Sequence, residues 1–465
     1  MMRRPKNFSN RRSFLGSMGA SAIGSPAILS SLLNLNLTGS LSAENAEDDD
    51  YRALVCVFLV GGNDSYNMVA PIGGDARTSY DITRSFAGVP VDGLLPLPEP
   101  VGDGLELGIH ASMPEVHSLY TQGKAAIVAN VGTLIGPTDL TSFQNGMAKL
   151  PLGLFSHSDQ QQQWLSTSPE TRSALTGWGG RMADLVNSLN GASKVSMNVS
   201  VHGLNIFQSG NVTTSFAIGS SGAAQLLNWD NPLFAERKVA ADSLLSAEYD
   251  NIFERAFATT KKDALEANTE YIQAVNSQDP LQSTFTGTNE LSKELKVVAE
   301  TINSRVALNK TRQTFYVSLS GFDSHASTGG HAELMRKVSQ ALGEFQTALA
   351  EMGLEEKVTT FTCSDFARTA APNSSGTDHG WGGNQFVIGG AVSGRKMFGT
   401  YPELALGTNL DTGRGRYIPT TAIEEYYADL ALWMGVSRSD LPQVLPNIGR
   451  FWSTWSQGLP LGIMA

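Results

Sequence analysis

The sequence predicts an α/β fold, a three-layer sandwich in which helices cover both faces of a mostly parallel central sheet. Two observations predict it. Six short runs are almost continuously apolar instead of alternating, which is typical of strands buried on both faces. Helical patterns separate these runs, and strands that alternate with helices build α/β sandwiches. The six runs are 53–60, 125–131, 195–201, 313–320, 358–364 and 385–392.

The helical patterns are clearest at two places. In 331–353 the apolar residues recur every three or four positions on one face, and Gly353 closes the pattern. A second such pattern spans 420–435. The polar stretch near 228–304 has helical propensity, and we expect a helical excursion there. No linker rich in Pro, Gly or Ser divides 47–465, so we expect a single domain over that range.

The first 46 residues have the features of an export leader. They start with basic residues, carry the pair Arg11 and Arg12, and continue into a weakly apolar run rich in Gly and Ser. This is the pattern of a twin-arginine signal peptide, with cleavage near residue 46. A membrane anchor is the alternative, but no window between 13 and 41 sustains the roughly 18 apolar residues of a span. We expect export to the periplasm or the outside of a bacterial cell, with the twin-arginine translocase as partner and no stable membrane span.

Charge limits the partners of the mature chain. The 465 residues carry a formal net charge of −11. The leader holds five basic residues and one acid, a net +4, so its removal takes the charge from −11 to −15. An acidic surface of this size repels nucleic acid and anionic lipid. Nucleic acid is therefore not expected as a partner.

The two cysteines, Cys56 and Cys363, are too few for a disulfide framework. If the acids that come after their strands lie level, Cys56 is eight residues before Asp64 and Cys363 is two residues before Asp365. The difference of six residues, at about 3.3 Å each, separates the thiols by roughly 20 Å. A disulfide between them is therefore not expected.

Acids and histidines come directly after the predicted strands. Ligands of open parallel sheets bind outside the carboxyl ends of the strands, so side chains in these loops are candidates for a site. Carboxylates with imidazoles suit zinc, manganese or iron, and carboxylates alone suit magnesium or calcium. The candidates are Asp64 after the first strand, Asp323, His325 and His331 after the fourth, and Asp365, Arg368, Asp378 and His379 after the fifth.

Each candidate also has a purely structural interpretation. Asp64 in "GGND" could form only a turn, and His331 could merely begin a helix with an exposed ring. Asp378 could orient His379 instead of binding a metal itself. Arg368 could pair with an acid, or it could hold an anion with two hydrogen bonds.

Four stretches carry a resemblance to a known family: "LVGGNDSYNMVAP", "GFDSHAS", "SDFARTAAPNSSGTDHGWGGNQFVIGGAV" and "GRYIPTTAIEEYYADLALWMGV". In this order behind a twin-arginine leader, they resemble the domain of unknown function 1501 family, which is placed with the alkaline phosphatase and sulfatase superfamily. The resemblance covers about 52–451. It implies an alkaline-phosphatase-like α/β core with paired divalent ions at strand ends and a Ser or Thr nucleophile that cleaves phosphate or sulfate esters.

Carried over to this chain, the resemblance implies five metal ligands. These are Asp64, Asp323, His325 (or His331), Asp365 and His379.

The chain departs from the superfamily pattern in two ways. Asp365 is followed by Phe366 where an Asp-His pair is frequent, so one histidine is missing unless His379 or His331 replaces it. No motif marks the nucleophile. Ser156 and Ser158 in "LFSHSDQQQQW" precede a helical stretch, where the helix dipole and a nearby metal would activate a hydroxyl; ordinary helix capping is the alternative.

The leading hypothesis is an exported hydrolase of phosphate, sulfate or related esters that depends on a divalent metal, zinc, manganese, magnesium or calcium. Its substrate would be an anionic ester, held by Arg368. The main alternative is a non-catalytic secreted binding or assembly protein that retains the fold. A redox enzyme ranks last, because the chain has neither a dinucleotide glycine fingerprint nor the cysteine sets of iron–sulfur clusters.

Overall fold

The structure is a computed structural model of the 465-residue chain, and it describes residues 50–102, 104–223, 232, 235–452 and 458–465. The described residues fall within one compact unit, 48–465. The predicted leader, 1–46, lies outside them. None of the helices in the described ranges has the length and apolar character that crossing a membrane requires.

A nine-stranded sheet forms the centre of the unit, and its main path has the order β11-β5-β10-β9-β1-β8-β6-β7 with β12 paired to β5. β10 runs antiparallel to β9 and β5, and the other pairs are parallel, as the sequence predicts. The strands are β1 (Arg52–Val60), β5 (Ala125–Gly132), β6 (Asn198–Ser200), β7 (Phe216–Ala217), β8 (Arg312–Ser320), β9 (Val358–Ser364), β10 (Gly383–Ile388), β11 (Met397–Phe398) and β12 (Thr421–Ala422).

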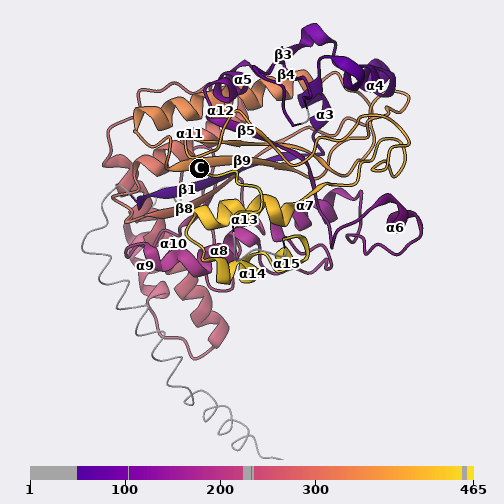
Figure 1. Ribbon diagram of the computed structural model, residues 1–465. Coiled ribbons are helices and arrows are strands. Elements are labelled where there is room, and N and C mark those ends of the chain that lie inside the picture. Colours follow the sequence, from indigo (N-terminus) through magenta and orange to yellow (C-terminus); the bar gives the residue numbers. More distant parts are fainter. Residues whose placement is uncertain (1–49, 103, 224–231, 233–234, 453–457) are drawn as a thin grey trace, which may run out of the picture. The chain divides into compact units, whose positions relative to one another are not determined.

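Helices cover both faces of this sheet (Figure 1), which confirms the three-layer α/β fold. One face carries α5 (Pro114–Thr121), α11 (Glu290–Asn303) and α12 (His331–Glu351). The other carries α7 (His157–Ser166), α8 (Trp178–Val186), α13 (Ile423–Trp433), α14 (Leu441–Val444) and α15 (Ile448–Phe451).

Alternate residues of β1 enter different cores, which explains its continuous apolar run. Val55 and Val57 pack in the core beneath α11 and α12, whereas Leu54 and Phe58 pack in the core beneath α8 and α13. Each residue of the strand therefore loses its water on folding, and burial of a Val, Leu or Phe side chain contributes roughly 1.5–3 kcal/mol.

Shorter elements surround the main sheet. A three-stranded antiparallel sheet joins β2 (Val69–Pro71), β3 (Leu94–Pro96) and β4 (Leu107–His110) in the order β2-β4-β3. The remaining α-helices are α3 (Ser65–Met68), α4 (Gly74–Arg84), α6 (Leu140–Gln144), α9 (Ala235–Leu245) and α10 (Ile252–Asn276). Single 3₁₀ turns occur at Ser85–Ala87, Val91–Gly93, Asn187–Leu189 and Arg438–Asp440.

Three helices occupy the described part of the polar stretch 228–304. α11 buries nine of its residues and belongs to the layer that covers the sheet. α9 buries none and α10 buries four. The excursion from the core is thus limited to α9 and the first half of α10.

The strands end at a common edge because of their register. Val60 of β1 pairs with Ser320 of β8, and Leu59 pairs with Ser364 of β9. Asp365 therefore lies at the level of Val60, while the loop 61–63 carries Asp64 beyond the edge.

This register overturns the expected separation of the two cysteines. Cys56 pairs with Phe361, only two positions before Cys363, and the Sγ atoms lie 3.5 Å apart. The prediction of roughly 20 Å was wrong because it placed Asp64 level with Asp365, although 61–63 are a loop. Both thiols are free and buried, and burial raises the pKa of Cys56.

Candidate metal centre

Six acidic and histidine side chains gather beyond the carboxyl ends of β8 and β9, which are neighbours of β1 in the sheet. They come from the loops after these two strands, the loop before β10 and the first turn of α7. They are His157, Asp323, His325, Asp365, Asp378 and His379.

Asp365 holds the ring of His157. The carboxylate is fully buried, and its Oδ2 lies 2.5 Å from His157 Nδ1 and 3.0 Å from Gln161 Nε2. Its Oδ1 accepts the Gly61 N–H at 3.2 Å. An ionised carboxylate only accepts hydrogen bonds, so His157 carries a proton on Nδ1 and, in the neutral ring, a lone pair on Nε2. Such a carboxylate–histidine pair is how proteins orient a metal-binding imidazole.

A backbone carbonyl fixes the tautomer of His379 in the same way. Its Nδ1 lies 2.5 Å from the carbonyl oxygen of Phe155, which can only accept, so the proton is on Nδ1. Its Nε2 is buried and has no hydrogen-bond partner in the described chain. Burial lowers the pKa of His379 to about 4, so the ring is neutral at neutral pH. A buried unpartnered acceptor is costly, which indicates that Nε2 has a partner when the site is complete.

Glycines allow the loop that bears His379 to pack closely. A Cβ at Gly376 would lie 1.9 Å from the carbonyl oxygen of Ser324, and one at Gly380 would lie 2.6 Å from that of Ala367. Both contacts are with backbone, which cannot move aside. The glycines of "GTDHGWGG" therefore let this loop lie against the loops after β8 and β9.

Asp323 completes a group of three potential ligands. Its Oδ1 accepts hydrogen bonds from His325 Nδ1 at 2.6 Å and Arg368 at 2.8 Å. Burial alone would raise the pKa of Asp323, but these hydrogen bonds outweigh burial and lower it. The Oδ2 atom has neither partner and lies 3.8 Å from His157 Nε2.

The spacing of this group fits one metal ion. The ligand atoms of His157, Asp323 and His379 all lie within 4.8 Å of one another. Two ligands at about 2.1 Å from a tetrahedral ion are separated by about 3.4 Å, so the 3.8 Å between His157 and Asp323 closes with a small rotation. Two imidazoles and one carboxylate favour zinc, manganese or iron over calcium or magnesium.

Asp64 and His331 lie apart from these three ligands. Asp64 is buried and forms an ion pair with Arg84 of α4, and its Oδ1 has no hydrogen-bond partner. His331 is buried, its Nε2 lies 3.1 Å from Asn63 Oδ1, and its ring packs against His110. Burial lowers the pKa of His331 to about 4. The interpretation of His331 as a helix-start residue with an exposed ring was wrong, because α12 begins inside the core.

Arg368 supports the loops instead of facing a cavity. Its guanidinium is fully buried and donates to the carbonyl oxygens of Gly61, Gly62 and Thr377 as well as to Asp323. These contacts use four of its five N–H groups, and Nη1 also lies 3.2 Å from His325 Nδ1, so the buried guanidinium is packed within the chain on every side. Its role as a clamp stays a prediction without geometric support.

Asp378 pairs with Arg414 and accepts from Asn373 Nδ2 at 2.9 Å. Its Oδ1 lies 3.9 Å from His325 Nε2. The partner that orients His379 is the Phe155 carbonyl, not Asp378. Burial would raise the pKa of Asp378, but the hydrogen bond from Asn373 and the charge of Arg414 lower it.

Ser156 and Ser158 flank His157 and lie 3.3 Å apart, Oγ to Oγ. Ser156 is the N-cap residue of α7, but its side chain makes no capping hydrogen bond. Neither hydroxyl donates to the six side chains of the centre within the described chain. Their role as nucleophile remains a prediction.

His157 is the residue that sequence reasoning missed. It lies next to Ser156, but no strand-like run directly precedes it, so the strand-end rule does not select it. Phe366, where a histidine was expected, packs against His157 with ring centroids 4.8 Å apart. The histidine beside Asp365 thus comes from another element, α7. The one sequence signal that could have found it is a histidine in the first turn of a predicted helix.

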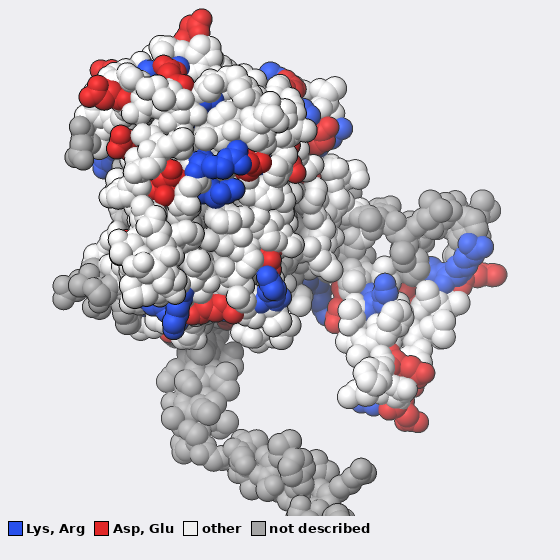
Figure 2. Space-filling model, turned by 90° about the vertical axis from the view of Figure 1, so that its right-hand side faces the viewer, with Lys and Arg blue, Asp and Glu red and all other residues white. Residues whose placement is uncertain are grey.

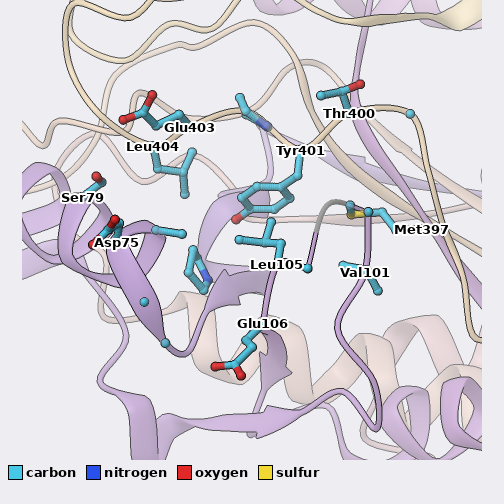
Figure 3. A pocket seen from close by; sticks show the side chains of 18 residues that line it. Asp75, Ser79, Val101, Leu105, Glu106, Met397, Thr400, Tyr401, Glu403 and Leu404 are labelled. Atoms are coloured by element: carbon cyan, nitrogen blue, oxygen red, sulfur yellow. The ribbon is translucent and has the colours of Figure 1, made fainter.

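A separate cavity of about 770 Å³ lies between α4, the 101–106 loop and the 397–404 segment (Figure 3). Asp75, Glu106 and Glu403 surround Tyr401 there, and no Lys, Arg or His of the described residues lines it. It shares no residue with the metal centre. Its carboxylates would repel an anionic ester.

The fold and the site together define an α/β protein with histidine and aspartate side chains gathered at the carboxyl edge of its sheet, three of which could hold a metal ion. The sequence profile of a family described as "Protein of unknown function (DUF1501)" matches residues 51–414. The chain belongs to this family, which confirms the resemblance seen in its motifs. No curated protein matches the chain in sequence.

Solved structures of sulfatases and phosphatases align with the chain at low identity. A sulfatase, PsFucS1 from Pseudoalteromonas sp., is 10% identical over 88% of this chain and 73% of its own, with a TM-score of 0.34. The lipoteichoic acid synthase LtaP from Listeria monocytogenes is 8% identical over 87% and 78%, with a TM-score of 0.35. The alkaline phosphatase from the Antarctic bacterium TAB5 is 14% identical over 76% and 96%, with a TM-score of 0.20. Likeness at these TM-scores carries no inference about chemistry.

Proposed function

We propose that this protein is an exported, metal-dependent hydrolase of phosphate, sulfate or related esters. The observation that carries the proposal is the group of three side chains, His157, Asp323 and His379, whose potential ligand atoms lie within 4.8 Å of one another. Asp365 and the Phe155 carbonyl hold the two imidazoles in the tautomer that binds a metal. Export rests on the twin-arginine leader with Arg11 and Arg12.

Three protein ligands are typical of catalytic zinc sites, because they leave a coordination position for water or substrate. A bound divalent ion would lower the pKa of a nucleophile and neutralise charge that develops on the ester oxygens. The side chains around the three potential ligands would transfer protons and position the substrate. His325 donates from Nδ1 to Asp323 and has its Nε2 3.9 Å from Asp378, so Nε2 can take a proton from the nucleophile or return one to the leaving group.

Arg416 is better placed than Arg368 to bind the anion. Its Nε donates to the His379 carbonyl oxygen at 2.9 Å, and its guanidinium lies over the Phe155 ring. Its remaining N–H groups have no hydrogen-bond partner among the described residues, and the side chain is partly exposed. A guanidinium fixed at Nε can offer these donors to a phosphate or sulfate oxygen.

One observation favours a non-catalytic binding or assembly protein instead. Within the described chain, no serine or threonine hydroxyl is hydrogen-bonded to the three potential ligands, and the Arg368 guanidinium is fully buried. A metal could then serve only to hold the loops together. Metal binding without ester cleavage would support this second function.

The test measures metal content and hydrolysis on the same samples. The full-length exported protein is analysed by plasma mass spectrometry after incubation with zinc, manganese, magnesium or calcium, beside His379→Ala and His117→Ala variants. His117 is a partly exposed histidine on α5 that contacts Pro96, so it serves as the matched control. We expect close to one metal ion per chain in wild type and control, and loss in His379→Ala.

Hydrolysis of aryl phosphate and aryl sulfate esters is then compared among the three proteins. Cleavage that depends on the bound metal supports the hydrolase. A wild-type protein that binds none of the four metals and contains no iron refutes both the metal centre and the hydrolase.

A further inference from the structure

The helix α10 is packed against the body along only half of its length. Its second half is anchored by Tyr271, which lies 2.9 Å from Thr301 of α11 and packs on Phe216. In its first half, from Ile252 to Glu266, Ala258 is the single buried residue. Figure 1 shows α9 and this half of α10 together at one edge of the unit, outside the two helical layers.

An apolar groove of about 1010 Å³ runs between α9, the first half of α10 and β7. Three large side chains that line it are mostly exposed: Phe253 at 82%, Phe257 at 63% and Leu244 at 63%. On the face shown in Figure 2, Lys and Arg lie interspersed with Asp and Glu among uncharged residues. An exposed apolar surface of this size indicates a contact with another molecule.

We infer that this groove is the interface of a homodimer, in which the first half of α10 packs antiparallel against the same helix of a second copy. The charges on α10 are self-complementary in that arrangement. Glu254 and Lys261 both line the groove, and neither has an ion-pair partner among the described residues. They lie seven residues apart, so a two-fold axis midway between them, between Phe257 and Ala258, places Glu254 of each copy level with Lys261 of the other.

The aromatic side chains fit the same symmetry. Phe257 lies beside the axis and would contact Phe257 of the second copy. In the single chain the Lys261 ammonium lies 5.7 Å from the centre of the Phe257 ring, a cation–π contact that keeps this charge beside the apolar side chains of the groove. The groove therefore offers a central apolar contact flanked by opposite charges, which is the usual organisation of an interface.

The size of the surface predicts a dimer of moderate affinity. The exposed parts of the two phenylalanines amount to roughly 300 Å², since a buried phenylalanine covers about 200 Å². Stable interfaces bury at least about 600 Å² per partner, with roughly 20–30 residues a side. Fifteen residues line the groove, fewer than in a stable interface of standard size, so the contact belongs to the small interfaces that form weak, reversible complexes. We therefore expect a dissociation constant in the micromolar range.

The experiment is sedimentation velocity on the full-length exported protein over a concentration series. Phe257→Glu is expected to raise the dimer dissociation constant at least 100-fold, because it places charge at the apolar centre. Lys261→Glu, which sets like charges against each other, should raise it about tenfold, a typical effect of opposed charges in a contact. The double variant Glu254→Lys/Lys261→Glu restores the pairing with reversed sign and should return to within a few-fold of wild type.

Leu175→Glu is the matched control, because Leu175 is also highly exposed but does not line the groove. Thermal melting checks that each variant is folded. A wild-type protein that sediments as a monomer up to about 100 µM overturns the inference and leaves the groove to a different occupant. A dimer that Phe257→Glu does not weaken, or a double variant no better than Lys261→Glu alone, overturns it as well.

Discussion

Replacement of Asp365 by Asn tests how the proposed metal centre is held. The carboxylate faces three donors, His157 Nδ1 at 2.5 Å, Gln161 Nε2 at 3.0 Å and the Gly61 N–H at 3.2 Å. The asparagine amide has the same shape, but only one acceptor oxygen and an NH₂ group. At least one of the three donors therefore faces the NH₂ group, which is itself a donor. His157 can avoid this only by moving its proton to Nε2, which removes the lone pair intended for the metal.

We expect the affinity for zinc to fall 10- to 100-fold in Asp365→Asn, the usual effect of removing the partner of a metal-binding histidine. This corresponds to about 1.4–2.8 kcal/mol. A competitive titration against a chromophoric chelator measures it. Gln161→Ala is the matched control, since it removes a donor from the same carboxylate but leaves the His157 bond, and we expect a change of less than about threefold. A folded Asn variant with wild-type affinity would refute the proposed role of Asp365.

Two further predictions concern other groups. Burial raises the pKa of Glu424 from 4.5 to about 8, so the folded protein keeps this proton at neutral pH. The contribution of the protonated group to the free energy of unfolding is complete below pH 4.5 and is lost as the pH rises through 8. At pH 7 the loss is roughly 3 kcal/mol. Glu424→Gln should flatten the fall of the unfolding free energy between pH 5 and pH 8 in denaturant titrations, and equal slopes would contradict the reasoning. Arg416→Ala should raise the KM for an aryl phosphate about tenfold without changing metal content. Arg395→Ala, which removes an exposed arginine paired with Glu99, is its control, and an unchanged KM in Arg416→Ala would exclude the anion-binding role.

The core strands were predictable because their apolar character is local information. A strand buried on both faces shows it in each residue, as in β1, where alternate side chains fill opposite cores. The same holds for the amphipathic face of α12, whose residues Val338, Leu342, Phe345 and Leu349 are buried as the spacing predicts. β6 is shorter than its predicted run because only three residues, Asn198–Ser200, pair as a strand near the end of the sheet.

By itself, the sequence determined the family, the α/β fold and the strand ends at which Asp323, Asp365 and His379 meet, because parallel strands bring the loops after them to one edge of the sheet. Only the tertiary structure decided which side chains complete the site. His157 arrives from the first turn of a helix far along the chain from both acids, and the three-residue loop 61–63 carries Asp64 away to Arg84. The tautomers of both histidines depend on partners 208 and 224 residues distant. Such contacts arise from register and loop length, which no local pattern records.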